Sequence, residues 1–452
     1  YNMARALEQR HDLDGAIFFY QGALKQKPDW AEVHDALGNV LGNRGNLLGA
    51  KEEFQKALQS KPDLALAHFH LGATDWFLQD YAGAAKELAD AVRLDPTNPG
   101  AHYYLGLSLR QGGKAEQGLS EMREAARRNP ASLEFANGLG LALQKDGYPA
   151  DAIAQFRKAV ELDPNSADAH NNLGLALLQE REPDEAIAHF KAAIQNDPKN
   201  TSPRNNLGLA LLQKAQWEDA IAAFRGLIAL DPRDAEAYYN LGVAMKQKED
   251  FDGAIQALQQ AVAVDPQLPE AHYTLGVIYW QQGKLDDAAQ EFRAALKVQP
   301  DYEQAHSILG SVLRQQNNLD EALAELREAV RLNPDDAGAH QALGMTLRQK
   351  GQTDEAIKEF QIAETLNKKL MNIQAATLAT NTGTKQLSEG DVDGSIEKFR
   401  NALKIAPDFA AAHYQLGMAL LKKGNPEEAR AEFEKAHRLD PHLKPPLDQA
   451  PR

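Results

Sequence analysis

The 452-residue sequence contains no cysteine, which excludes disulfide bonds, a thiolate nucleophile and any zinc site built on cysteine. Basic residues are too few to balance the acidic ones, 49 against 64, and the net charge is −15. General binding to a phosphate backbone needs a basic surface, so we expect no nucleic-acid partner. No apolar run reaches the roughly 18 residues of a membrane span, and no signal peptide is recognisable.

The sequence opens on Tyr1 and not on methionine, and we expect that its natural start has been trimmed. The compartment stays open at this point. A trimmed start and the lack of cysteine permit an extracytoplasmic location without indicating one.

What the sequence has in abundance is repetition. A Leu-Gly pair recurs every 34 residues, and a fixed period of this length predicts stacked supersecondary units whose function lies on the surface of the stack. The pairs are Leu37-Gly38, Leu71-Gly72, Leu105-Gly106, Leu139-Gly140, Leu173-Gly174, Leu207-Gly208, Leu241-Gly242, Leu275-Gly276, Leu309-Gly310 and Leu343-Gly344.

Each repeat reads as two amphipathic helices, A and B, because apolar residues recur three and four apart in each half. We number positions from six residues before the leucine, so that the Leu-Gly pair occupies positions 7 and 8. Glycine often marks the turn at position 15, and proline at position 32 ends helix B. Full repeats begin at residues 31, 65, 99, 133, 167, 201, 235, 269, 303, 337, 376 and 410.

Leu-Gly at positions 7 and 8, alanine at 20, phenylalanine at 24, alanine at 27 and proline at 32 together resemble the tetratricopeptide repeat. The resemblance covers essentially the whole chain. It implies an all-α solenoid that winds into a superhelix, without catalytic activity or cofactor, whose concave face binds a protein or peptide ligand.

The phase of the repeats divides the chain. Five extra residues follow the tenth repeat, Lys368 stands where proline is expected, and Glu364 is polar at the usually apolar position 28. We therefore predict a mechanical break between Phe360 and Thr384. The expected regions are a near-complete first repeat at 1–30, an array in strict phase at 31–364, an insertion and hinge at 365–375, two further repeats at 376–443 and a proline-rich tail at 444–452.

The resemblance also places positions 2, 5, 9, 12 and 13 of helix A on the concave face. Amides there could hold a peptide backbone without reading its sequence, or could simply be soluble helix formers; they are Gln111, Gln179, Gln213, Gln247, Gln281, Gln315 and Gln349 at position 13 and Asn137, Asn171 and Asn205 at position 5. Aromatic anchors and cations complete the predicted groove, namely Phe69, Trp76, Phe77, Tyr103, Tyr239, Tyr273 and Trp280 with Arg110, Lys246, Arg314 and Arg348.

Histidines at position 4 of helix A raise the question of a metal. Stacked helices lie about 8 to 10 Å apart, too far for histidines of successive repeats to share one ion, so we expect a packing role and no metal. They are His34, His68, His102, His170, His272, His306, His340 and His413. No catalytic motif is recognisable, and an enzyme is the least favoured reading.

A structural role is the alternative to a binding scaffold. Nearly every residue belongs to a repeat, so copies could stack end to end into a filament, possibly outside the cell. Arg430 and His437 make the last helix B polar, which resembles an end-cap. If copies do stack, these residues should meet polar partners in the first helices, for which Glu8 and Asp12 are candidates.

Overall fold

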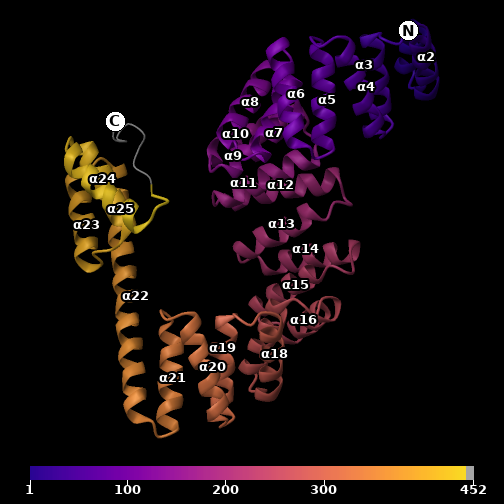
Figure 1. The fold of residues 1–452 in the computed structure, drawn as a ribbon. Coiled ribbons are helices and arrows are strands. Elements are labelled where there is room, and N and C mark those ends of the chain that lie inside the picture. Colours follow the sequence, from indigo (N-terminus) through magenta and orange to yellow (C-terminus); the bar gives the residue numbers. More distant parts are fainter. Residues whose placement is uncertain (444–452) are drawn as a thin grey trace. The chain divides into compact units, whose positions relative to one another are not determined.

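The computed structural model describes residues 1–443, and the expected tail at 444–452 lies outside this range. The described residues form 25 helices and no strand, which confirms the all-α solenoid (Figure 1). The chain divides into two compact units, Tyr1–Ala254 and Ile255–Arg452, which we describe separately. No helix within residues 1–443 is both long and apolar enough to cross a membrane.

Helices A and B alternate along the chain. In the first unit they are α1 (Asn2–Gln9), α2 (Leu13–Gln26), α3 (Ala31–Asn43), α4 (Leu47–Ser60), α5 (Ala65–Phe77), α6 (Tyr81–Leu94), α7 (Pro99–Gln111), α8 (Ala115–Arg128), α9 (Leu133–Lys145), α10 (Pro149–Leu162), α11 (Ala167–Gln179), α12 (Pro183–Asn196), α13 (Ser202–Gln213), α14 (Trp217–Leu230) and α15 (Ala235–Gln247). Helix α16 (Phe251–Val264) runs across the boundary between the units.

The second unit continues the alternation until one helix of double length. It holds α17 (Pro269–Gln281), α18 (Leu285–Val298), α19 (Glu303–Gln315), α20 (Leu319–Leu332), α21 (Ala337–Gln349), α22 (Thr353–Ser388), α23 (Val392–Ile405), α24 (Ala410–Lys423) and α25 (Pro426–Leu439).

The pairing of helices A and B depends on the small-against-large pattern of the repeat. A Cβ built on Gly38 would lie 2.6 Å from the ring of Phe54, so only glycine at position 8 lets the aromatic side chain at position 24 seat against helix A. Ala50 at position 20 is fully buried in the same contact. Gly45 closes the turn with φ of 80°, a conformation that glycine adopts without strain.

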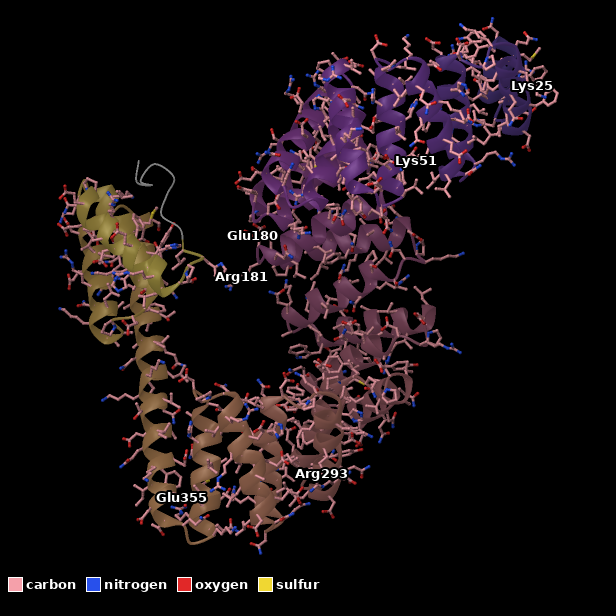
Figure 2. All side chains as sticks on the ribbon, in the orientation of Figure 1. Lys25, Lys51, Glu180, Arg181, Arg293 and Glu355 are labelled. Carbon is pink, nitrogen blue, oxygen red and sulfur yellow. The ribbon has the colours of Figure 1, made fainter. Side chains whose placement is uncertain are left out.

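Ion pairs connect successive repeats, and Figure 2 labels two of the residues that form them, Arg293 and Glu355. Arginine at position 25 pairs with an acid at position 19 of the next repeat, as Arg293 does with Glu321 at 2.6 Å and Arg327 with Glu355 at 3.4 Å. A second set joins position 14 to the acid at position 18 of the preceding repeat. Its members are Arg44 with Asp14, Lys214 with Asp184, Lys248 with Glu218, Lys350 with Asp320 and Lys423 with Asp393.

Helix α22 differs from the sequence expectation of two helices joined by a turn. It is a single helix of 36 residues that contains helix B of the repeat beginning at residue 337, the five extra residues, and helix A of the repeat beginning at residue 376 (Figure 1). The reason is local, because no proline or glycine occurs between Gly351 and Gly383 to end the helix. Whether residues 365–375 act as a hinge stays a prediction.

Candidate functional site

The histidines at position 4 form hydrogen bonds that connect a repeat to the one before it. The Nδ1 of His34 lies 2.6 Å from the Glu53 carboxylate, and its Nε2 lies 2.8 Å from the carbonyl oxygen of Pro28 in the preceding repeat. The imidazole therefore joins the Glu53 side chain of its own repeat to the turn that precedes it. The pairing with glutamate 19 residues further on recurs as His68 with Glu87, His102 with Glu121, His272 with Glu291, His306 with Glu325, His340 with Glu359 and His413 with Glu432.

The glutamate partners were not predicted, although a glutamate 19 residues after a position-4 histidine is visible in the sequence. One repeat departs from the rule, because His170 faces His189 with their Nδ1 atoms 2.9 Å apart. Burial, and next the neighbouring His170, lower the pKa of His189.

His68, Glu87 and Asp90 could offer three ligand atoms to a metal, since these atoms lie within 4.8 Å of one another. Glu87, however, already forms ion pairs with His68 and Lys86.

An aromatic cluster occupies helices α5, α7 and α9 in the first unit. Trp76 makes edge contacts with Phe77 and Tyr104, with ring centroids 5.1 and 5.7 Å apart. Tyr103 stacks on Phe135 at 4.7 Å. Tyr104 and Phe135 were not predicted, because they lie at positions 6 and 3 and not at the positions that the resemblance assigns to the concave face.

Tyr103, which was predicted as a groove aromatic, is largely buried. Its side chain is 6% exposed, and Gly138 on α9 lets its ring approach, since a Cβ there would lie 2.1 Å from the hydroxyl oxygen. Burial, and next the Glu134 carboxylate, raise the pKa of Tyr103 above its ordinary range. Phe69 and Trp76 are half-buried, and Phe77 is exposed.

A pocket of about 420 Å³ opens beside this cluster. Trp76 and Tyr103 form one part of its wall, and Leu141, which is 50% exposed, forms another. The indole Nε1 of Trp76 is buried without a hydrogen-bond acceptor among the described residues. The pocket is further lined by Leu107, Arg110, Gln111, Ala115, Met122, Gly138, Ala142, Lys145 and Asp146.

Arg110 is not a free cation in this pocket. Its guanidinium forms an ion pair with both carboxylate oxygens of Asp146, and Nη2 donates to the Ala142 carbonyl oxygen at 3.3 Å. The Arg110 hydrogen bond lowers the pKa of Asp146. The pair therefore connects α7 to the end of α9, and Lys145 is the remaining charged residue of the lining.

Five of the ten predicted amides form hydrogen bonds between repeats. At position 5, Asn171 and Asn205 accept from Asn206 and Asn240, which lie at position 6 of the next repeat, at 2.9 and 3.4 Å. Asn137 differs, because its Oδ1 is buried without a partner among the described residues.

At position 13, Gln349 donates to Asn317 of the preceding repeat at 3.2 Å, and two other amides accept from the residue 35 positions earlier. Gln179 accepts from Gln144 at 2.6 Å, and Gln315 accepts from the indole of Trp280 at 3.2 Å. A hydrogen bond between residues 35 positions apart thus occurs near both ends of helix A in some repeats. The amides that form these bonds connect successive repeats, whether or not they also bind a ligand.

The chain matches the family described as "Tetratricopeptide repeat" over residues 36–99, 74–132, 137–201, 273–337 and 309–369. Further matches to tetratricopeptide models cover residues 177–244, 246–283 and 386–444. The chain belongs to the tetratricopeptide repeat family. Comparison with curated proteins found no match.

Three solved structures are similar to this chain, each with a TM-score below 0.5. One is YrrB, described as a TPR protein with an unusual peptide-binding site (22% identity, 42% of this chain and 97% of that one, TM-score 0.38). Another is MamA from Desulfovibrio magneticus RS-1 (23%, 38% and 96%, TM-score 0.36). The third is the Cut9–Hcn1 hetero-tetramer of the APC/C (16%, 97% and 92%, TM-score 0.38).

The remaining predicted residues of the tetratricopeptide groove occupy helices A as expected, with varied exposure. Gln111, Gln213, Gln247, Gln281 and Gln349 are exposed, and Tyr239 and Lys246 are half-buried. In the second unit, Tyr273 packs against Tyr302 at 5.0 Å, and Arg348 lies over the Phe360 ring at 5.5 Å. The Nε of Arg314 is buried without a partner among the described residues.

The residues proposed for end-to-end contacts already have local partners. Tyr20 donates to Glu8 at 2.8 Å, and Asp12 accepts from the Gly15 amide as the cap of α2. Arg430 donates to Glu434 at 3.2 Å, and His437 is exposed in the last turn of α25. Stacking of copies into a filament stays a prediction.

Proposed function

We propose that this tetratricopeptide chain is a non-enzymatic scaffold that binds a protein or peptide segment on the exposed surface of its helices A, with the aromatic pocket on α5, α7 and α9 as anchor point. The observation that carries the proposal is the coincidence of a pocket, an exposed apolar rim and an unsatisfied donor. Leu141 supplies exposed apolar surface in the pocket lining, exposed Phe77 lies next to the pocket against Trp76, and Trp76 supplies the indole N–H. Anchors of protein interfaces combine these features.

The pocket favours an apolar side chain over a charged one. Its wall is mainly apolar, and the single ion pair in the wall, Arg110 with Asp146, is already complete. An acidic ligand would have to compete with Asp146 for Arg110, which costs free energy. Exposed Gln111 and Lys145 at the rim can hydrogen-bond the backbone on either side of the anchor.

Position 9 of helix A provides a matched pair of variants. Leu141 lines the pocket and is 50% exposed, whereas Leu209 occupies the same position in the repeat beginning at residue 201 and is 37% exposed. Substitution of either leucine by aspartate removes exposed apolar surface, so both variants should fold. Only Leu141→Asp should disturb an anchored ligand.

The test begins with selection of phage-displayed random dodecapeptides on the immobilised chain. Peptides that bind are synthesised, and their affinity is measured by fluorescence anisotropy for the unchanged chain and for both variants. We expect Leu141→Asp and Phe77→Ser each to weaken binding at least about tenfold, or roughly 1.4 kcal/mol, and Leu209→Asp to leave it unchanged. Equal affinities for all variants, or an equal loss for Leu209→Asp, would contradict the proposal.

A further inference from the structure

Both halves of helix α22 expose positions that are covered by a neighbouring repeat elsewhere in the array. Its first half carries Ile357 at position 21 and Glu364 at position 28, and the following repeat does not pack against them because the helix continues. Its second half carries Leu378 at position 3 and Lys385 at position 10, which face no preceding repeat. Leu378 is 71% exposed, whereas the alanines at position 3 of neighbouring repeats, Ala305 and Ala339, are fully buried.

These residues fall on one line along α22. Glu364, Met371, Leu378 and Lys385 are seven residues apart, close to two turns, so they follow a single stripe of the kind that pairs in coiled coils. Met371 at the middle of the stripe is 68% exposed. Glu364 forms no ion pair within residues 1–443, and Lys385 reaches Glu389 only at 3.9 Å.

The ordinary contact between repeats would not suit this stripe. At the junction of α18 with α19, Ala289 at position 21 clusters with Val312 at position 10 of the next helix A. The same register on α22 would place Ile357 against Lys385, and by extension Glu364 against Leu378. Each contact would bury a charge against an apolar side chain, which is unfavourable.

If the second helix is shifted by seven residues from this ordinary register, each apolar residue of the stripe faces an apolar residue and each charge faces the opposite charge. We propose that α22 pairs in antiparallel orientation with α22 of a second copy, so that Met371 of each chain packs on Leu378 of the other and Glu364 of each chain faces Lys385 of the other. The contact is isologous, as in most homodimers, and its charges are complementary at both ends. The surface is distinct from the aromatic pocket, so dimer formation and ligand binding can be tested independently of each other.

Cysteine cross-linking tests the register directly, because the chain has no cysteine of its own. Met371→Cys and Leu378→Cys chains are prepared separately, mixed and oxidised mildly. We expect disulfide-linked dimers in the mixture and few in either variant alone, since equal positions would lie about 10 Å apart along the helix, beyond the reach of a disulfide. Efficient cross-linking of Met371→Cys alone would overturn the register, and a chain that stays monomeric at about 100 μM in sedimentation velocity would overturn the pairing.

Charge reversal and a neighbouring residue supply the controls. Glu364→Lys should raise the dimer Kd about threefold or more, and Glu364→Lys with Lys385→Glu should restore it. Met371→Glu should raise the Kd at least about tenfold. Leu370→Glu replaces an adjacent exposed residue, 54% exposed against 68% for Met371, that lies off the stripe, and should leave the Kd unchanged. Equal losses for Leu370→Glu and Met371→Glu would contradict the proposed face.

Discussion

The junction of α20 with α21 and the corresponding stretch of α22 consist of equivalent repeat positions. Side chains at these positions are buried at the junction and exposed on α22. Leu323 at position 21 is 3% exposed, because it clusters with Leu343 and Leu347 of the next helix A. Ile357 at the same position one repeat later is 49% exposed. The apolar side chain is therefore present in both places, and what differs is whether the following helix turns back to cover it.

The charges at α22 also differ from those at the junction one repeat earlier. At five junctions a base at position 14 pairs with an acid at position 18 of the preceding repeat, as Lys350 does with Asp320. At α22 the corresponding residues are Glu389 and Asp354, which would repel each other if the ordinary junction formed. Position 7 has likewise changed from the buried Leu343 to the exposed Thr382.

The largest expected difference between the two regions comes from shortening one leucine in each. Leu343→Ala removes buried apolar volume from an ordinary junction and should lower the free energy of unfolding by roughly 3 to 4 kcal/mol. Leu378→Ala, at an exposed position of α22, should change it by less than about 0.5 kcal/mol in dilute solution. Urea unfolding followed by circular dichroism measures both, and similar losses would mean that the α22 face is covered within the chain.

A proline tests whether α22 is one helix. Lys368→Pro restores the residue that usually ends helix B, but in a continuous helix it removes a hydrogen bond and clashes with the preceding turn, at a cost of about 3 kcal/mol. We expect amide exchange to accelerate on both sides of residue 368. Unchanged exchange would show that residues 365–375 already form a turn or hinge, as the sequence analysis predicted.

The sequence predicted the repeated part of the molecule well and its departures from the repeat less well. Leu-Gly against phenylalanine, as in Gly38 and Phe54, is a local rule, so helix pairs could be placed without coordinates. The extra residues before Ala376 were recognised, but continuation of the helix across them depends on the absence of any strong stop, which is a weaker signal than a proline.

The candidate site shows the same limit. Position in the repeat located Trp76 and Phe77 on helix A correctly. It could not show that Tyr103 turns inward, because this depends on Gly138 in the next repeat. It also could not show that Arg110 is neutralised by Asp146, since contacts between repeats follow a spacing of about 35 residues that a single repeat does not reveal.

The local stability of α19 should depend on pH, whereas that of the middle of α22 should not, and this difference should be smaller than the effects described above. Burial alone would lower the pKa of His306, but hydrogen bonds to Glu325 and to the Pro300 carbonyl outweigh it and raise the pKa. Burial, and next Asp336, raise the pKa of Glu303 to about 7. A raised His pKa gives stability that is lost as pH rises through the folded value, and a raised Glu pKa acts in the same direction, because ionisation is penalised in the folded state.

We therefore expect α19 to exchange its amides faster, relative to the intrinsic rate, at pH 8 than at pH 6. The loss should be about 1 kcal/mol or less, since both groups are partly open to solvent. The middle of α22 has no histidine and should show no such change. The double variant His306→Gln and Glu303→Gln is the control, and a pH dependence that survives in it would have another cause.

Charge reversal at position 14 should give the smallest difference in the free energy of unfolding between the two regions. Lys350→Glu replaces an ion pair with repulsion from Asp320 and should cost about 0.5 kcal/mol, as is usual for exposed pairs. Glu389→Lys would create the missing pair with Asp354 only if the ordinary junction formed at α22, so we expect no gain. A gain equal to the loss at Lys350, measured in urea at low ionic strength, would contradict the separation of these residues.

One pair of disulfide variants tests the interruption of the array most directly. Leu323→Cys with Leu347→Cys joins positions 21 and 11 across an ordinary junction, where the two leucines share one cluster. Ile357→Cys with Gln386→Cys joins the same positions across α22, where 29 helical residues separate them by about 44 Å. At submicromolar concentration the first variant should form an intramolecular disulfide and the second should not. An intramolecular disulfide between residues 357 and 386 would show that α22 folds back like every other junction, and would contradict the account.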